Sequence, residues 1–346
     1  MALWTEVIDP ATLSGYARES LAAYEARQGT LARFLPNRFI SDVVARFVAG
    51  QNGGLVDVAN FRAFDAEPEI GNRDVSRRVT IELPALGRSE PITEYEQLRA
   101  RGGSVSAELA LVTVQGATDR TVRAIADAIE RLRGIVIDTG IATIDQYNFK
   151  SADNFGRDAD HAVTAGTLWS NTAADRLTQL STWSQTYTDD TGSEPGALLM
   201  STRAFRALCN GDQFRMVLQG GATRPAITQD VRDLVIGNGL PPITLYDRRV
   251  KVNGTLTKVL PDNKVYLLPA AVDTNDAEGT DLGGTWWGRT LSSTVPGYGI
   301  EDSDQPGVVV GVYQHDKPPH GLEVIGDAIG LPVLANPDLS FVATVL

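Results

Sequence analysis

The chain ends in HGLEVIGDAIGLPVLANPDLSFVATVL (residues 320–346), where an apolar pattern continues to the last residue. The ends of a chain usually fray unless another part of the fold holds them. The stretch contains a long apolar run, a Leu-Pro-Val-Leu then Asn-Pro step, and a final β-like segment, LSFVATVL. We therefore expect the chain to end in a strand inside a sheet and not in a tail.

Other segments of the C-terminal half also predict strands. YDRRVKVNGTLTKVLPDNKVYLLP (246–269) reads as strands around the turns VNGT and PDNK. GVVVGVYQHDKPPHGLEVIGDAIGLPVLA (307–335) gives two strands around a proline-rich bend. GALLMSTRAFRALCNG (196–211) predicts a buried strand, a helix capped by Ser201, and an Asn-Gly stop.

Two segments predict amphipathic helices. Residues 117–138 carry one apolar stripe and one charged face, and we expect a helix of about 20 residues there, capped by Thr118. A second helix is expected within residues 167–187, with Trp169 and Trp183 on its apolar side. The stripe of the first helix comprises Val122, Ile125, Ile129, Leu132 and Val136, and its charged face comprises Arg120, Arg123, Asp127, Glu130 and Arg133.

The N-terminal quarter predicts an arm followed by a long hairpin. Residues 9–26 and 36–50 show helical spacing, the latter through Phe39, Val43, Val44 and Phe47. Residues 55–64 and 76–87 alternate apolar and polar side chains around a charged turn, DAEPEIGNRD (65–74). A lone two-stranded hairpin is marginally stable, so we expect its outer part to pack on something else.

Composition excludes several classes of protein. The chain has 346 residues, a formal net charge of −12 and one cysteine, Cys209, which we expect to be a packed small side chain. This charge argues against a protein that coats nucleic acid through a basic face. No apolar run is long enough for a transmembrane helix, and the N-terminus does not read as a signal peptide.

The sequence offers no convincing catalytic, cofactor-binding or metal site. HDKPPH (315–320) could aim two histidines at zinc, but a solvated loop is favoured because a third ligand is missing. DTNDAEGTD (273–281) lacks the spacing of a calcium loop. No phosphate loop, dinucleotide fingerprint or nucleophile elbow is present.

The order of these parts resembles the major capsid protein of tailed bacteriophages, with the Hong Kong 97 fold, and most closely its lambda-type capsid protein E branch. Residues 246–269 look like that family's strand–turn–strand, and residues 320–346 look like its C-terminus. The resemblance implies an α+β fold with four parts. These are an N-terminal arm (1–52), an extended β-hairpin loop (53–98), a peripheral domain with a long spine helix (99–144 and 306–328), and an axial domain (145–305 and 329–346).

The function implied by the resemblance is a self-assembling shell. Hexamers and pentamers would form an icosahedral head in the virion, assembled in the bacterial cytoplasm, that encloses double-stranded DNA without binding it tightly. The implied partners are a separate scaffolding protein, since the arm starts almost at once, a portal and a decoration protein; no cofactor, membrane or enzymatic activity is implied. We expect the loop tip to contact neighbouring subunits through Asp65, Glu67, Glu69, Arg73 and Asp74.

One departure from the family pattern and two alternatives accompany this interpretation. Some relatives weld their shells with a Lys–Asn isopeptide bond that starts in the extended loop, but residues 53–98 contain no lysine. An encapsulin-like compartment shell would share the fold. A carbohydrate-active enzyme built around Trp286 and the acids of residues 273–281 is the other alternative, and turnover by the purified monomer would identify it.

Overall fold

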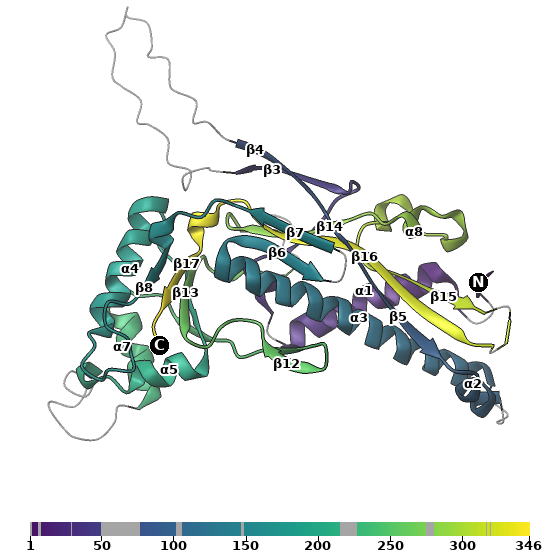
Figure 1. The fold of residues 1–346 in the computed structure, drawn as a ribbon, viewed down its shortest axis with the longest axis horizontal. Helices are drawn as coiled ribbons and strands as arrows, with labels where there is room; N and C mark the ends of the chain where they lie inside the picture. The colour runs from purple at the N-terminus through teal and green to yellow at the C-terminus, as the bar shows by residue number, and fades with distance from the viewer. Residues whose placement is uncertain are drawn as a thin grey trace, which may run out of the picture.

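The computed structural model describes residues 2–5, 8–28, 30–49, 77–101, 106–146, 149–214, 227–274, 280–315, 317–318 and 320–346. Within these ranges the chain forms two main sheets, each covered by helices (Figure 1). None of the helices described is both long and apolar enough to cross a membrane.

The first sheet is built around one long strand. β16 pairs along its first half with β15 and β5, and along its second half with β14. Helices α1 and α3 pack on this sheet. The elements are β1 (Ala2–Leu3), α1 (Pro10–Gln28), β2 (Asn37–Phe39), β5 (Ala85–Ile92), α3 (Ser106–Thr139), β14 (Gly283–Gly288), β15 (Val309–Gln314) and β16 (Leu322–Leu334).

The burial of β16 explains its sequence pattern. Leu322, Val324 and Ala328 are buried and alternate with partly exposed residues. At Gly326, an added Cβ would lie 2.3 Å from Cγ2 of Thr121. Glycine is therefore required where α3 crosses this strand closely.

The spine helix is longer than the sequence predicted. α3 has 34 residues and begins at Ser106, so Thr118 is not its N-cap. The hydroxyl of Thr118 donates instead to the carbonyl of Val114, 2.9 Å away within the same helix. The predicted stripe is confirmed, since Val122, Ile125 and Ile129 are at most 2% exposed.

The second sheet contains the end of the chain. Its order is β10-β9-β13-β17-β8, so β17 lies between an antiparallel neighbour, β13, and a parallel neighbour, β8. This confirms that the chain ends as an interior strand. The strands are β8 (Ala162–Thr164), β9 (Ala197–Met200), β10 (Ile243–Leu245), β13 (Lys264–Leu268) and β17 (Phe341–Thr344).

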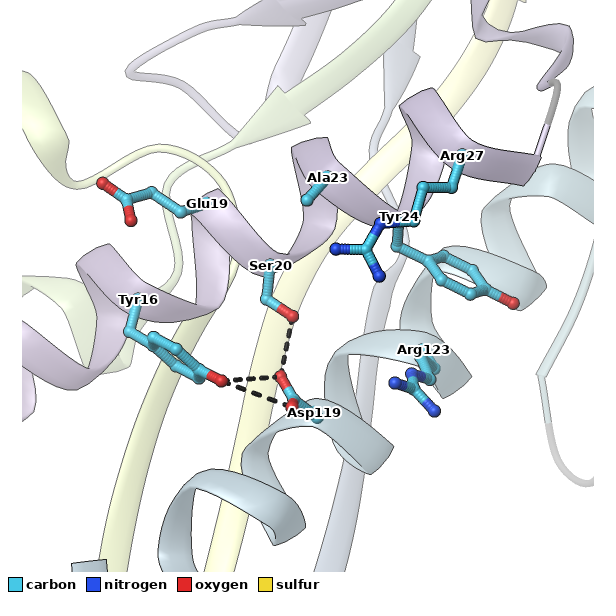
Figure 2. A pocket seen from close by; sticks show the side chains of 8 residues that line it. All are labelled: Tyr16, Glu19, Ser20, Ala23, Tyr24, Arg27, Asp119 and Arg123. Atoms are coloured by element: carbon cyan, nitrogen blue, oxygen red, sulfur yellow. Dashed lines mark hydrogen bonds between the residues drawn. The ribbon is translucent and has the colours of Figure 1, made fainter. Parts of the chain in front are cut away.

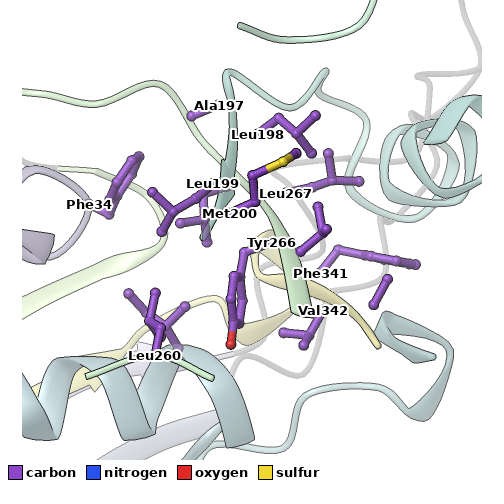
Figure 3. Packing of buried hydrophobic residues seen from close by; sticks show 14 of the residues in the cluster. Phe34, Ala197, Leu198, Leu199, Met200, Leu260, Tyr266, Leu267, Phe341 and Val342 are labelled. Atoms are coloured by element: carbon purple, nitrogen blue, oxygen red, sulfur yellow. The ribbon is translucent and has the colours of Figure 1, made fainter. Parts of the chain in front are cut away.

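The three central strands of this sheet, β9, β13 and β17, lie at the centre of the larger hydrophobic core (Figure 3). Side chains of β9, β13 and β17 pack together there, with Tyr266 facing both Leu199 and Val342 in register. A smaller core lies between α1, α3, β15 and the first half of β16. Both α3 and β16 contribute to the two cores. The N-terminal part of each element packs in the smaller core, and the C-terminal part packs in the larger.

Helices around the second sheet match the sequence in part. Ser201 caps α5 (Thr202–Cys209) by accepting from the amide of Ala204, as predicted. Cys209 is buried, which confirms its expected role as a packed side chain, and burial raises the pKa of its thiol to about 11. The flanking helices are α4 (Arg176–Thr191) and α7 (Thr228–Gly237).

The helix expected within residues 167–187 starts later than predicted. Asp175 caps α4, accepting from the amide of Thr178, so Trp169 precedes the helix. Trp169 still stacks on Trp183, with ring centroids 6.5 Å apart, and its indole donates to Gln179. The apolar spacing correctly predicted that Trp169 and Trp183 pack together. It placed the start of the helix too early, because the helix begins only after its N-cap, Asp175.

The turn VNGT forms the predicted hairpin between β11 (Arg249–Val252) and β12 (Thr255–Lys258). Asn253 and Gly254 have φ of 48° and 85°, the positive values that a type I′ turn needs. A second hairpin joins β6 (Ile141–Gln146) to β7 (Phe149–Asn154). The short elements are η1 (Leu31–Arg33), α2 (Glu94–Arg101), η2 (Ala159–His161), α8 (Leu291–Thr294), η3 (Pro296–Tyr298), η4 (Asp302–Asp304) and η5 (Pro337–Leu339).

The helix expected within residues 36–50 is wrong. This segment contains β2 and a second strand, β3 (Val44–Ala49), which pairs with β4 (Arg77–Glu82). Valine-rich segments favour strands, and a short apolar run matches helical and strand spacing about equally well. Ala45 is fully buried and Phe47, two positions later, packs on the larger core, so these two side chains of β3 face inward.

Candidate functional site and assembly surfaces

The hairpin of β3 and β4 projects from the body of the subunit (Figure 1). Its base is anchored, since Ala45 and Ile81 are buried in the larger core and the amide of Leu83 donates to the carbonyl of Val43. The predicted contact residues of the loop tip lie outside the described residues: Asp65, Glu67, Glu69, Arg73 and Asp74.

The second half of the predicted loop is part of the first sheet. All eight residues of β5 pair with β16 of the same subunit, from Leu322 opposite Ile92 to Ile329 opposite Ala85. Segment 53–98 therefore contains a strand that completes the subunit's own sheet as well as one strand of the projecting hairpin.

A buried arginine links the N-terminal helix to the spine helix. Arg133 of α3 is 0% exposed and donates to Glu25 of α1 at 2.6 Å, to Asn37 at 2.7 Å and to Thr285 at 2.8 Å. Burial alone would lower the pKa of Arg133, but Glu25 and Glu130 raise it above its usual value. The guanidinium is therefore charged and has a partner for each of its three nitrogens.

Glu130, beside Arg133, accepts hydrogen bonds from a second set of residues. Its carboxylate accepts from Thr30 Oγ1 at 2.6 Å, from the amide of Leu31 at 2.9 Å and from the hydroxyl of Tyr246 at 2.5 Å. Burial, with the nearby charge of Glu130, raises the pKa of Tyr246 far above its usual range, so this hydroxyl stays a donor. Arg248 is the next member of this network, and its guanidinium lies 3.7 Å from the carboxylate of Glu130 and 2.9 Å from that of Asp127.

Glu130 and Arg133, which the sequence places on the charged face of the helix, are not exposed to solvent. Both side chains are at most 1% exposed, because α1 and the segment from Thr30 to Asn37 cover this side of α3. A signal was present in the sequence. Glu25 continues a stripe at four-residue spacing with Leu13, Ala17 and Leu21, and all three are buried. An acid on an apolar stripe predicts a buried partner of opposite charge.

The network lies where the two cores meet. On α3, Ile129 belongs to the smaller core and Val136 to the larger, with Glu130 and Arg133 between them. Charged hydrogen bonds of this network connect α3 to α1, to β2, to β14 and to the segment before β11. These acids and bases neutralise one another, so the arrangement suits holding elements together and not acid–base catalysis.

An open pocket lies between α1 and α3 (Figure 2). It has a volume of about 290 Å³. At one end Asp119 accepts from the hydroxyls of Tyr16 at 3.2 Å and Ser20 at 2.8 Å. Arg27 and Arg123 lie toward the other end, near Tyr24 (Figure 2).

The structure describes Trp286 but only part of the acidic loop proposed for a carbohydrate site. Trp286 lies on β14 within the first sheet, with the guanidinium of Arg38 5.6 Å from its ring centre. Trp287 is buried and its indole donates to Asn37, whereas its neighbour Trp286 is partly exposed. Residues 275–279 of the acidic loop lie outside the described residues.

The histidines do not gather into a metal centre in the part of the chain that the structure describes. His161 is buried and its Nε2 lies 2.9 Å from Asp190. His315 lies 3.5 Å from Glu323, and His320 contacts the backbone of His315. Among the described residues no group of three or more possible ligands comes together.

Comparison with known proteins identifies the family. The family model described as phage major capsid protein E matches residues 20–279, about three quarters of the chain. The chain therefore belongs to the phage major capsid protein E family. No curated protein matches the chain by sequence.

Two solved structures share the fold. The putative capsid protein of a prophage of E. coli CFT073 is 14% identical, with a TM-score of 0.66 over 98% of this chain and 99% of that one. A phage-related protein from Bordetella bronchiseptica RB50 is 16% identical, with a TM-score of 0.62 over 99% and 97%. The α+β fold of Hong Kong 97 type is thus confirmed.

Family and fold together make this chain a structural subunit of a phage capsid shell, and it associates with copies of itself. It is a virion component and not an enzyme, so the carbohydrate-active alternative is wrong. The encapsulin-like alternative gains no support from the family model, which is that of a phage protein.

Proposed function

We propose that this subunit forms hexamers and pentamers that close into an icosahedral head around double-stranded DNA. The observation that carries the proposal is the β3–β4 hairpin, whose base is fixed in the subunit core while its strands project from the body. A projecting strand pair has too little apolar surface to be stable alone and gains it by lying on another subunit.

We propose the same four-part division that the sequence suggested. Support comes from the two cores, because α1, the N-terminal part of α3 and residues 308–328 share the smaller core. Residues 331–345 join the larger core with most of the segment from 165 to 282. The extended loop (53–98) would then contain β4 of the hairpin and β5, with β5 also belonging to the subunit's own sheet.

The net charge of −12 supports a container that encloses DNA without gripping it. A scaffolding protein, a portal and a decoration protein remain proposed partners, as does assembly in the bacterial cytoplasm. Their surfaces would be found by crosslinking purified shells and identifying the joined peptides.

Shortening the hairpin tip tests its role. Replacing Ala66–Val75 with a short glycine-containing turn should leave a soluble subunit with near-native circular dichroism, since deletions in exposed loops are tolerated. The same variant should form few or no closed shells, because an intersubunit contact is lost. Electron microscopy counts the shells. If the variant assembles as well as the unaltered protein, the hairpin tip is not needed for assembly and this proposal is wrong.

Mature particles should contain no covalent bond that starts from the extended loop. Residues 53–98 lack lysine, so an isopeptide bond of the kind found in some relatives cannot begin there. Particles boiled in detergent should run as single chains of 37.2 kDa. A ladder of covalent oligomers on the gel would refute this prediction.

A further inference from the structure

The β11–β12 hairpin has one cationic face, although the whole chain has a net charge of −12. Val250 on β11 is buried, so its neighbours on that strand, Arg249 and Lys251, point to the opposite, exposed face. Cross-strand pairing adds their partners on β12 to the same face. The cationic face therefore comprises Arg249, Lys251, Leu256 and Lys258.

Two charges of the cationic face are available to another molecule. Lys258 forms ion pairs with Asp247 at 3.1 Å and with Asp262 at 3.3 Å. Arg249 and Lys251 are exposed, and neither forms an ion pair with another residue that the structure describes. Opposite Lys251, Leu256 is 66% exposed. An apolar side chain bordered by charged ones is typical of a contact between proteins.

A surface of complementary composition lies around α8, and we call it the acidic patch. Its apolar part is Leu291, which is 83% exposed, and Val295, which is 45% exposed. Its acidic part is Glu301 and Asp302, at the start of η4. Both acids are exposed, and neither forms an ion pair within the described part of the chain.

The acidic patch stays negative although two arginines lie beside it. Arg289 donates to Gln305 at 3.0 Å, and Gln305 donates to Asp302 at 2.8 Å, which holds η4 close to the start of α8. Arg18 donates to the backbone carbonyl of Asp304. The carboxylates in this region outnumber the two guanidinium groups and belong to Glu301, Asp302, Asp304 and Asp327.

The two surfaces lie on opposite long sides of the subunit, with the β11–β12 hairpin on one side and α8 on the other (Figure 1). Copies in a ring meet head to tail, through two different surfaces of each copy. A second copy of this chain therefore presents charges and apolar side chains that match the cationic face. A DNA backbone would match the two cations but would leave Leu256 without an apolar partner.

We propose that the cationic face of one copy binds the acidic patch of the next copy in the ring. Leu256 packs against Leu291, and the two cations of β11 face the carboxylates of Glu301 and Asp302. This inference rests on the ring assembly proposed above and names one of its contacts. It is separate from the β3–β4 contact, because neither surface includes that hairpin.

Reversing the charges on each surface tests this contact. The hairpin variant, Arg249→Glu with Lys251→Glu, should form about tenfold fewer shells than the unaltered protein, because like charges then meet. The patch variant, Glu301→Lys with Asp302→Lys, should show the same defect. All four substitutions in one chain make the charges opposite again and should restore the number of shells. Electron microscopy counts the shells, and thermal unfolding of each variant should match that of the unaltered protein.

Mixing the two variants gives a second readout that needs no closed shell. In analytical ultracentrifugation each variant alone should associate less than the unaltered protein. An equimolar mixture should associate more than either variant, since each copy then meets one of opposite charge. Lys150→Glu with Lys317→Glu is the matched control, because it reverses two exposed charges outside both surfaces and should change neither readout.

Several outcomes would overturn the proposal. Normal assembly of the hairpin variant or of the patch variant removes the contact. Two defective variants that the combined variant does not restore would mean that each surface binds something else. Normal assembly with lost binding to a short DNA duplex in the hairpin variant would reassign the cationic face to phosphate. A mixture that associates no more than its components overturns the contact even if the unaltered protein forms no shells, a result that would count against the ring assembly separately.

Discussion

Replacing Arg133 with methionine should lower the free energy of unfolding of the subunit by about 3–5 kcal/mol. The substitution fills much of the same space but leaves Glu25 and Glu130 buried without their cation. The loss is far larger than that of an exposed ion pair. Urea unfolding of the unassembled subunit, followed by circular dichroism, measures the difference.

Arg120→Met on the same helix is the matched control. Arg120 is exposed and lies 3.6 Å from Glu90, so its loss should cost about 1 kcal/mol or less. Adding Glu25→Gln to Arg133→Met should recover part of the stability, because it removes one unpaired charge. Equal stability of Arg133→Met and the unaltered protein would show that the network does not hold the two cores together.

Replacing Ile129 with aspartate should prevent the subunit from folding. Ile129 is 2% exposed in the smaller core, and an unpaired carboxylate there costs several kcal/mol, a large part of the stability of a domain. The expected result is insoluble protein on expression or a subunit without a cooperative unfolding transition.

Val112→Asp provides the control for this substitution. Val112 lies on the same helix but is 64% exposed, so the change should alter stability by about 0.5 kcal/mol or less. A soluble Ile129→Asp protein that unfolds cooperatively at normal stability would mean that the apolar stripe of α3 is assigned to the wrong face.

The sequence predicted elements whose pattern is local. The terminal strand, the hairpin at Asn253–Gly254, the cap at Ser201 and the stripe of α3 all follow from neighbouring residues, and all are confirmed. Their physical causes act within a few residues, through turn geometry, capping and periodicity.

The features that the sequence did not predict depend on contacts between distant residues. Arg133 is buried because Glu25, more than 100 residues earlier in the chain, lies against it. Segment 44–49 is a strand because it pairs with residues 77–82. The start of α3 at Ser106 was not predicted, because the apolar stripe was followed only from Val122 and Thr118 just before it fits the pattern of an N-cap. The loop-tip contacts stay predictions, because their residues lie outside those described.

Electron microscopy of the purified protein tests the central claim, that this subunit closes into an icosahedral shell. The protein would be imaged at high concentration, alone and with the scaffolding protein encoded nearest to it. We predict hexamers, pentamers and closed shells of uniform size. A protein that stays strictly monomeric under both conditions would contradict this account.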